Sequence, residues 1–530
     1  MGLRMQAEHR TAGSKSGKND SRKGSTMDVL FARVFAPPKG HAVSKSGIRN
    51  FFLAGLLLAF STSFTASAAI PMAQLSTKQR LRTEAMLTQH IQQLVDRQGR
   101  IEGQGKFVKA QVRLDQSRGF VIIDLSQSYL PAERQDLNDL TDEFADEVVF
   151  LLKDSITVHG VLFTYDGKDV YDYFPEEKPE TQPERVPPKR TSKQDASLLG
   201  ARDDFVVISA GHGRYINFGK LGNTPVWDWQ RPTESNGIIE DVNNPHFADE
   251  LGRWFYQRSF DDVVTSPARS TSTAIHAPSG EEWWKVAGKY HLQSILPDNP
   301  EVWDFGGHTN RRLADYNKDI NSRPKYANYL DATAIIHLHS DASTNPSARG
   351  TNAIYHTGRE QARLLGNNIL CSMKEIIQAQ EAYATFPVST DSLARTNYGE
   401  NELALMPSVL IEIAFHTNPD DAAALLDPVF RTASMKGVEK DIGSTGRAFL
   451  ANLSQLPTCR QRAATTVLRC RCQRITRASR NFPSRPRSRS HRVREHVVTA
   501  SRHSRKRIHL RSLGHSGATA HQALRLELSA

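Results

Sequence analysis

Hydrophobic residues recur at helical spacing in two stretches near the start of the chain, at Leu87, Ile91 and Leu94 and again at Phe144 and Val148. A period of three to four residues predicts one buried face on each of two helices. Between and after these stretches, residues 107–114, 120–125 and 158–165 are short apolar runs bounded by turn residues, which predicts strands. Residues 72–174 are therefore predicted to form a small α+β domain.

Further along, three continuous apolar runs alternate with helical patterns, at residues 205–210, 333–338 and 408–415. Strands buried on both faces have this pattern in α/β domains. We therefore predict an α/β fold for residues 200–457, with a twisted, mostly parallel sheet flanked by helices. Asn244 and Pro245 suit the start of one helix. The segment from about 259 to 308 interrupts the alternation and is interpreted as an insertion.

Composition marks two further regions and one isolated cysteine. Residues 175–199 contain five prolines among charged residues, which predicts a linker between the two domains. Residues 458–530 hold 17 Arg, 1 Lys and 2 Glu with no hydrophobic period, and we expect this Arg-rich tail to be disordered. Cys371 is the single cysteine of the body and is interpreted as a small buried residue.

Residues 1–69 contain an export signal. Lys45 and Arg49 precede the apolar run 51–60, and Ala66-Ser67-Ala68 follows as a cleavage site. The run is too short to span a bilayer, so no stable membrane span is expected after cleavage. Because 44 residues precede Lys45, we expect translation to start downstream of Met1.

The net charge of +11 hides an uneven distribution. The tail carries +16 and residues 1–69 carry +7, so the remainder carries 11 − 16 − 7 = −12. An acidic body does not favour nucleic-acid binding. An Arg-rich nucleic-acid-binding protein is therefore a hypothesis for the tail alone.

Two imidazoles and two carboxylates stand in or beside the predicted strands and a predicted helix. His212 follows the first strand, His339 ends the second, Glu412 lies in the third and Glu240 precedes a helix. Sites in open α/β sheets form beyond the carboxyl ends of the strands. Two histidines and one carboxylate make a common catalytic zinc shell, and a further carboxylate can act as the base. On spacing alone His337 shares a strand face with His339 and stays an alternative ligand.

Five segments in this order resemble the zinc-dependent Amidase_3 family of N-acetylmuramoyl-L-alanine amidases: residues 206–213, 237–243, 323–328, 336–342 and 407–422. The resemblance implies Zn²⁺ as cofactor, with His212, Glu240 and His339 as ligands and Glu412 as the catalytic carboxylate. It selects His339 over His337, and Glu240 over the nearby Glu234. Asp341 would lie just outside the ligands or in a substrate loop.

The same resemblance implies hydrolysis of the amide between N-acetylmuramic acid and L-alanine in peptidoglycan, for cell-wall turnover. Ser209 and Arg214 depart from the family pattern beside the first ligand. Residues 72–174 resemble a GerM-type domain, which implies a scaffold or binding role. We expect an exported protein of the periplasm, or alternatively a secreted one, with peptidoglycan and an envelope activator protein as partners. A catalytically silent peptidoglycan-binding or regulatory protein on the same fold is the alternative function.

Overall fold

The computed structural model describes residues 69–132, 134, 137–179, 184–185, 204–221, 224–259, 263–305, 314–396, 398–443, 495–500 and 508–513. The predicted export signal therefore lies outside the described residues. In the Arg-rich tail, for which we predicted disorder, strands β16 (Glu495–Ala500) and β17 (Ile508–Leu513) pair antiparallel, so these two segments have regular structure. The rest of the tail lies outside the described residues.

A nine-stranded, mostly parallel sheet organises the described chain, in the order β2-β3-β5-β14-β13-β15-β12-β6-β9. Its central strands are β6 (Asp204–Ala210), β12 (Ala334–Asp341) and β15 (Ser408–Phe415), which run parallel to one another. Only the pairs β2/β3 and β13/β15 are antiparallel. The α/β fold with a mostly parallel sheet is thus confirmed, and the three strongest apolar runs of the sequence form its centre.

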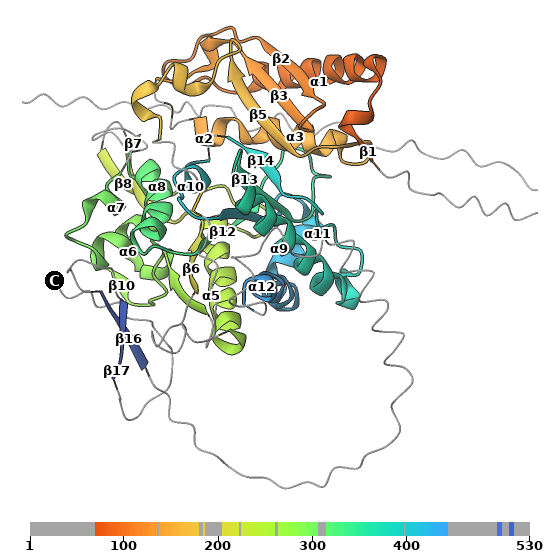
Figure 1. Cartoon of the computed structure of the whole chain (residues 1–530). Coiled ribbons are helices and arrows are strands. Elements are labelled where there is room, and N and C mark those ends of the chain that lie inside the picture. Colours follow the sequence, from red (N-terminus) through yellow and green to blue (C-terminus); the bar gives the residue numbers. More distant parts are fainter. Residues whose placement is uncertain are drawn as a thin grey trace, which may run out of the picture. The chain divides into compact units, whose positions relative to one another are not determined.

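Helices cover both faces of this sheet (Figure 1). Alternate residues of a strand point to opposite faces, so Val206 and Ile208 pack with α5 (Glu240–Arg258), α9 (Glu360–Gln378) and α12 (Pro428–Gly443). Val207 and Ile335 pack on the other face with α6 (Gly288–Ile295), α7 (Pro300–Trp303) and α8 (Ala314–Tyr329). His337 and His339 follow Ile335 at intervals of two, so they lie on this second face.

Residues 72–174 contribute strands to the same sheet. Strands β2 (Ala110–Asp115), β3 (Phe120–Leu125) and β5 (Gly160–Tyr165) form its first three positions, and β5 pairs with β14 (Leu393–Arg395) through Gly160 and Ala394. Helices α1 (Thr77–Arg97) and α3 (Asp142–Leu152) pack on these strands around their own hydrophobic core. The short helix α2 (Leu137–Leu140) precedes α3. The elements are those that the sequence predicts, but the sheet continues without a break.

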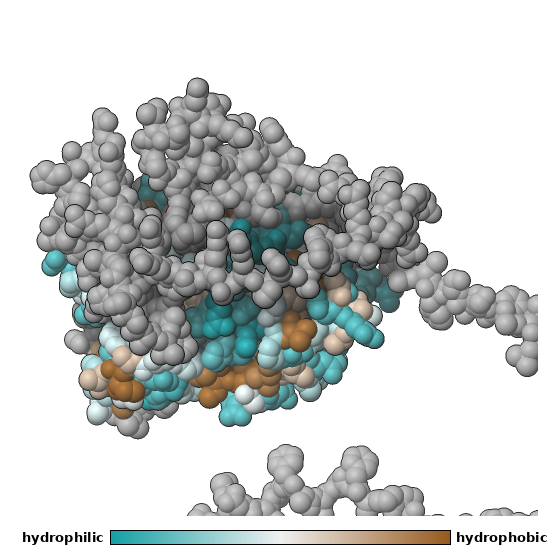
Figure 2. All heavy atoms as spheres, turned by 90° about the horizontal axis from the view of Figure 1, so that it is seen from below, coloured by the Kyte–Doolittle hydropathy of each residue, from teal (hydrophilic) through white to brown (hydrophobic). Residues whose placement is uncertain are grey.

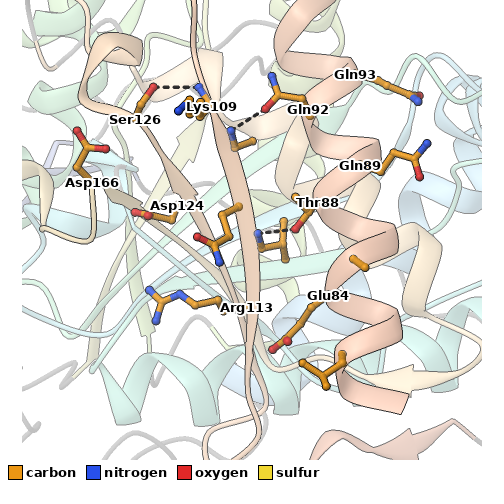
Figure 3. A pocket seen from close by; sticks show the side chains of 15 residues that line it. Glu84, Thr88, Gln89, Gln92, Gln93, Lys109, Arg113, Asp124, Ser126 and Asp166 are labelled. Carbon is orange, nitrogen blue, oxygen red and sulfur yellow. Dashed lines mark hydrogen bonds between the residues drawn. The ribbon is translucent and has the colours of Figure 1, made fainter. Parts of the chain in front are cut away.

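Helix α1 covers the outer edge of β2, and a pocket lies between them (Figure 3). The backbone N–H groups of Ala110, Val112 and Leu114 point outward from this edge strand. They donate to side chains of α1 at successive turns, namely Gln92 at 2.8 Å, Thr88 at 2.9 Å and Glu84 at 2.9 Å. An edge strand otherwise offers unpaired N–H groups to another chain. The helix side chains therefore complete the ladder that a tenth strand would have formed.

The predicted insertion begins as part of the sheet. Strand β9 (Val263–Pro267) pairs parallel with β6 and forms the last position. After it come the hairpin β10 (Ile275–His276) and β11 (Glu281–Glu282), the 3₁₀ turn η6 (Trp283–Lys285), α6 and α7. The hairpin β7 (Arg214–Leu221) and β8 (Thr224–Trp229) lies outside the main sheet. The alternation that seemed to stop at residue 259 therefore continues for one more strand.

The remaining strand of the main sheet is β13 (Asn352–His356). The other elements are β1 (Ile70–Pro71), which pairs with β4 (Ile156–Thr157), α10 (Gly399–Glu402), α11 (Pro419–Leu426) and the 3₁₀ turns η1 (Met72–Gln74), η2 (Gln127–Tyr129), η4 (Val170–Asp172), η5 (Pro175–Glu177) and η7 (Glu381–Tyr383). In the predicted linker, the Glu184 carboxylate accepts the backbone N–H groups of Gln361 and Ala362 at the start of α9. This part of the linker therefore contacts the body rather than being fully solvated.

Cys371 is buried in α9, as predicted, but it is also disulfide-bonded. This bond was not predicted from the sequence. Among the described helices, none has both the length and the apolar character needed to cross a membrane. On the face shown in Figure 2, hydrophilic and hydrophobic residues are interspersed.

Candidate metal centre and active site

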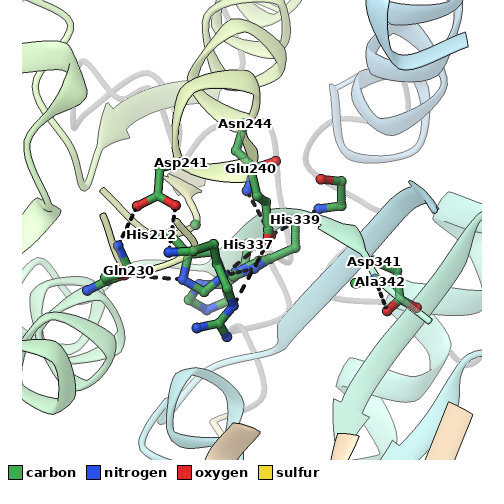
Figure 4. Close-up of polar contacts among 12 residues, drawn as sticks. His212, Gln230, Glu240, Asp241, Asn244, His337, His339, Asp341 and Ala342 are labelled. Carbon is green, nitrogen blue, oxygen red and sulfur yellow. Dashed lines mark hydrogen bonds and ion pairs between the residues drawn. The ribbon is translucent and has the colours of Figure 1, made fainter. Parts of the chain in front are cut away.

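Three of the predicted site residues come together at the carboxyl ends of the central strands (Figure 4). Nδ1 of His339 lies 3.1 Å from Nε2 of His212, and each of these nitrogens lies 3.3 Å from Oε1 of Glu240. All three side chains are buried. One ligand atom from each lies within 4.8 Å of the others, which is close enough for all three to bind one metal ion.

His212 occupies a backbone conformation that ordinary side chains rarely adopt, with φ of 64°. The adjacent turn requires two glycines. A Cβ atom on Gly211 would lie 2.3 Å from Cε1 of His339, and one on Gly213 would lie 2.7 Å from the backbone of Ala287. These glycines make room for the His339 ring and a neighbouring chain segment.

Glu240 is the first residue of α5, which corrects the helix start predicted at Asn244 and Pro245. Proline has no N–H to donate to the carbonyl four residues earlier, which here belongs to Asp241. Nη2 of Arg269 donates to this carbonyl at 2.9 Å instead, so the helix tolerates Pro245 in its second turn. Nη1 of Arg269 also donates to the carbonyl of His212 at 2.9 Å. One buried guanidinium thus joins the segments that carry His212 and Glu240.

His337 and Glu234, the alternatives to His339 and Glu240, differ from them in burial and in position. His337 lies two residues before His339 on β12, is fully buried and is not part of the three-residue group. Burial lowers the pKa of its imidazole to about 4. Glu234 is exposed, whereas Glu240 lies beside both imidazoles. The three-residue group therefore contains His339 and Glu240, the two residues that the family resemblance selects.

Side chains that the sequence analysis did not assign to the site contact the outer nitrogens of both imidazoles. Nδ1 of His212 lies 3.1 Å from Oε1 of Gln230, and Nε2 of His339 lies 3.0 Å from Oε2 of Glu400. Ser209, one of the departures from the family pattern, is buried, and its hydroxyl has no hydrogen-bond partner among the described residues. Gln230 therefore supports the first histidine. Neither Gln230 nor Glu400 belongs to a recognisable motif, which is why spacing could not identify them.

Glu412 faces the group from the neighbouring strand. The register of β12 and β15 pairs it with His339, and its side chain is 9% exposed. Its Oε2 atom is buried and has no hydrogen-bond partner within the described residues. Burial raises the pKa of this carboxyl well above its ordinary value, and the carboxylates of Asp341 and Glu240 raise it further. A raised pKa strengthens the hold of this carboxyl on a proton, which suits a group in general acid–base chemistry.

Asp341 ends β12 and does not touch the three-residue group. Its carboxylate accepts the N–H of Ala342 at 2.8 Å, and burial raises its pKa well above the ordinary value. Helix α3 lies nearby, because Oε1 of Glu147 accepts from Ser343 at 3.3 Å and Oε1 of Glu143 accepts from Thr344 at 2.8 Å. Asp146 of the same helix also raises the pKa of Glu412. The surroundings of Glu412 are thus strongly acidic.

The charges around the three-residue group favour a cation. Burial by itself raises the pKa of the Glu240 carboxyl, but the adjacent His212 and His339 lower it well below its ordinary value. Burial lowers the pKa of His339, yet Glu400 and Glu240 outweigh this and raise it to about 9. Two imidazoles and one carboxylate are also the donor types that zinc prefers. The residues present therefore fit a zinc ion.

The sequence of residues 206–443 matches the family model Amidase_3, described as N-acetylmuramoyl-L-alanine amidase. A search of curated protein sequences gave no match.

Several solved structures are similar to part of the chain. An N-acetylmuramoyl-L-alanine amidase from Clostridium difficile 630 is 16% identical over 45% of this chain and 94% of that chain, with a TM-score of 0.29. Ami1 from Mycobacterium smegmatis is 17% identical over 47% of this chain and 96% of that chain, with a TM-score of 0.28. The CwlD amidase from Clostridioides difficile, solved in complex with the GerS lipoprotein, is 15% identical over 44% and 94%, with a TM-score of 0.28.

The family match covers the strands, the turn and the helix that carry His212, Glu240, His339 and Glu412. Residues 206–443 are therefore an Amidase_3 domain, and the enzyme activity of this chain is that of an N-acetylmuramoyl-L-alanine amidase, a cell-wall hydrolase.

Proposed function

We propose that this amidase is zinc-dependent and cleaves the amide bond between the lactyl group of N-acetylmuramic acid and the L-alanine of the stem peptide. The observation that carries the proposal is the convergence of His212, Glu240 and His339 to within 4.8 Å, beside a catalytic carboxylate on the adjacent strand. Peptidoglycan is then the substrate, and turnover or remodelling of the cell wall is the process.

His212 would bind zinc through Nε2, His339 through Nδ1 and Glu240 through Oε1, since these atoms face one another. When bound, zinc acts as a Lewis acid and lowers the pKa of a coordinated water to about 7. Arg269 holds the backbone of His212 and that of Asp241, the residue after Glu240, and so keeps two of the ligand positions in register.

Glu412 takes the proton from the attacking water and returns it to the nitrogen of the leaving L-alanine. Its buried Oε2 has no competing hydrogen bond among the described residues. Burial and the neighbouring carboxylates raise the pKa of this carboxyl, which favours a group that first takes a proton as base and then returns it as acid. Burial of the site also limits the access of other water molecules.

The proposed place of action is the periplasm, after export; the alternative is secretion. The basic residues Lys45 and Arg49, the apolar run 51–60 and the Ala66-Ser67-Ala68 site support export. Residues 72–174, which resemble a GerM-type domain, would serve as a scaffold or binding element, and an envelope activator protein is a further predicted partner.

Digestion of purified peptidoglycan tests the reaction. Mass spectrometry of the products should find stem peptides with a free L-alanine amino terminus and glycan strands without peptides. Metal analysis of the same preparation should find one zinc per chain. Products cut in the glycan or between stem residues would contradict the proposal.

Glu412→Ala tests the catalytic role. Loss of a general base typically lowers the rate about 100- to 10,000-fold. The variant should therefore lose lysis in gels that contain cell walls and retain its zinc. Glu234→Ala, which changes an exposed glutamate in the loop before Glu240, is the matched control and should keep full activity. A wild type that binds zinc and peptidoglycan but releases no peptide would favour the silent regulatory alternative.

A further inference from the structure

The two imidazoles of the proposed metal site are connected by a continuous chain of buried polar side chains on the side away from the ligand atoms. This network of side chains runs from His212 through Gln230, Asp319, Arg323 and Glu400 to His339. Gln230 follows β8, Asp319 and Arg323 lie on α8, and Glu400 lies on α10. None of these four residues is more than 6% exposed. Three separate segments therefore meet behind the site.

The charged members of this network of side chains fix which atom donates and which accepts in each hydrogen bond. A carboxylate only accepts and a guanidinium only donates. Nη2 of Arg323 donates to Oδ2 of Asp319 at 2.6 Å, and Nη1 of Arg323 donates to Oε1 of Glu400. The remaining oxygen of Glu400, Oε2, can only accept from Nε2 of His339, 3.0 Å away. When the His339 ring is neutral, as a metal-binding imidazole must be, it therefore carries its proton on Nε2.

The same reasoning applies at the other end. Nε2 of Gln230 donates to Oδ2 of Asp319 at 3.0 Å, because the carboxylate cannot donate. This orients the amide so that its oxygen faces Nδ1 of His212, at 3.1 Å. His212 must donate from Nδ1, which leaves the lone pair of Nε2 pointing at His339 and Glu240.

We propose that Gln230, Asp319, Arg323 and Glu400 act as one positioning unit that fixes opposite tautomers on the two histidines, so that Nε2 of His212 and Nδ1 of His339 are both available to a metal ion. The inference rests on the proposed function, because it concerns ligands for the same ion. Partners of this kind orient metal-binding histidines, and their loss typically weakens metal binding about 10- to 100-fold. The four residues do not touch the reacting atoms, so they position rather than catalyse.

Glu400→Gln is the sharpest test, because the amide keeps the shape of the side chain but has one accepting oxygen in place of two. Arg323 can only donate, so it should take that oxygen, and the amide N–H₂ should then face Nε2 of His339. This favours the wrong tautomer, with the proton on Nδ1. The zinc dissociation constant, measured by competition with a chromophoric chelator, should rise about 10- to 100-fold.

Glu402→Gln is the matched control. Glu402 lies two residues further along α10, is 6% exposed where Glu400 is 4%, and also accepts from an arginine, Arg134. Among the described residues it makes no hydrogen bond or ion pair with the proposed ligands, and its other partner is Tyr171. The same chemical change at this position should leave the zinc dissociation constant within about twofold of the wild type.

A spectroscopic readout separates positioning from a general loss of structure. In nitrogen-15 spectra of histidine side chains, the signals of His339, identified by their loss in His339→Asn, should change from the Nε2–H to the Nδ1–H pattern in Glu400→Gln. Circular dichroism should show the fold retained. If Glu400→Gln does not fold, Gln230→Met tests the His212 end of the side-chain network and should weaken zinc binding to a similar extent.

The outcomes distinguish the two proposals. A wild-type protein that binds no divalent ion overturns the metal site and this inference with it. A wild type that binds zinc tightly, together with a folded Glu400→Gln variant of equal affinity and unchanged histidine signals, overturns the positioning unit alone. Weakened binding with the tautomer change, and an unaffected Glu402→Gln, supports it.

Discussion

The alpha carbon of Gly211 lies against the imidazole of His339, so closely that an added Cβ atom would stand 2.3 Å from Cε1 of the ring. The turn that presents His212 and the strand that presents His339 therefore fit together only without a side chain at residue 211. This contact places the two proposed ligands at a separation of 3.1 Å between their facing nitrogens.

Gly211→Ala should displace the His339 ring and impair the site. A shift of about 1 Å in a catalytic group can lower the rate about 100-fold, and we expect a loss of at least that order in kcat/KM together with weaker zinc binding. Gly252→Ala is the control, since a Cβ there meets nothing within 4 Å in the middle of α5. Alanine in a helix interior should add up to about 1 kcal/mol of stability. Equal zinc affinity in Gly211→Ala and wild type would contradict the steric argument.

Glu412→Gln should stabilise the metal-free protein at neutral pH. Burial first, and then the Asp341 and Glu240 carboxylates, raise the pKa of Glu412 above the value of about 4.3 that an unfolded chain gives it. The folded state therefore binds this proton more tightly, and deprotonation costs folding free energy at pH values above about 4.3. Glutamine does not titrate and avoids this cost.

Thermal unfolding in the presence of a chelator measures the effect. The midpoint of Glu412→Gln should exceed that of the wild type at pH 7, and the difference should shrink as the pH falls towards 4. A difference that is absent at pH 7, or that grows in acid, would mean that Glu412 is solvated or paired in the folded state.

Arg269→Met should destabilise the catalytic domain. The buried guanidinium donates to the carbonyl oxygens of Gly211, His212 and Asp241. Each buried polar group left without a partner costs about 1–3 kcal/mol, so the melting temperature should fall by several degrees and activity should fall with it. Arg253→Met, on the exposed side of α5, should change stability by no more than about 0.5 kcal/mol. Similar melting temperatures for both variants would contradict this role of Arg269.

Replacing Glu84, Thr88 and Gln92 together by alanine should expose the edge of β2. The N–H groups of Ala110, Val112 and Leu114 would lose their acceptors, and an unpaired strand edge invites pairing with another chain. Sedimentation velocity should reveal self-association of this triple variant at concentrations where the wild type does not associate.

The double variant Gln89→Ala, Gln93→Ala provides the comparison for the strand edge. Both residues are exposed on α1 and line the same pocket, but neither is bonded to β2. Association of this variant to the same extent would show that loss of polar surface, rather than the open edge, is responsible.

The sequence by itself determined the main elements and pointed to the residues of the candidate site. Continuous apolar runs such as 205–210 and 408–415 can be buried on both faces only as central strands, so the α/β fold followed from local pattern. Motif order likewise pointed to His212, Glu240, His339 and Glu412, whose roles as ligands and base stay predictions. Both kinds of inference use short local patterns and their order along the sequence.

Only the tertiary structure decided which distant groups meet. Glu400 contacts His339 across 61 residues and Gln230 contacts Asp319 across 89, and no local pattern marks either pair. Pro245 lies inside a helix because Arg269, far along the chain, takes the carbonyl that proline leaves unpaired. Residues 72–174 join the main sheet through a single pairing of Gly160 with Ala394. These outcomes depend on hydrogen-bond partners supplied from elsewhere in the fold, and a periodicity read along the chain carries no information about such partners.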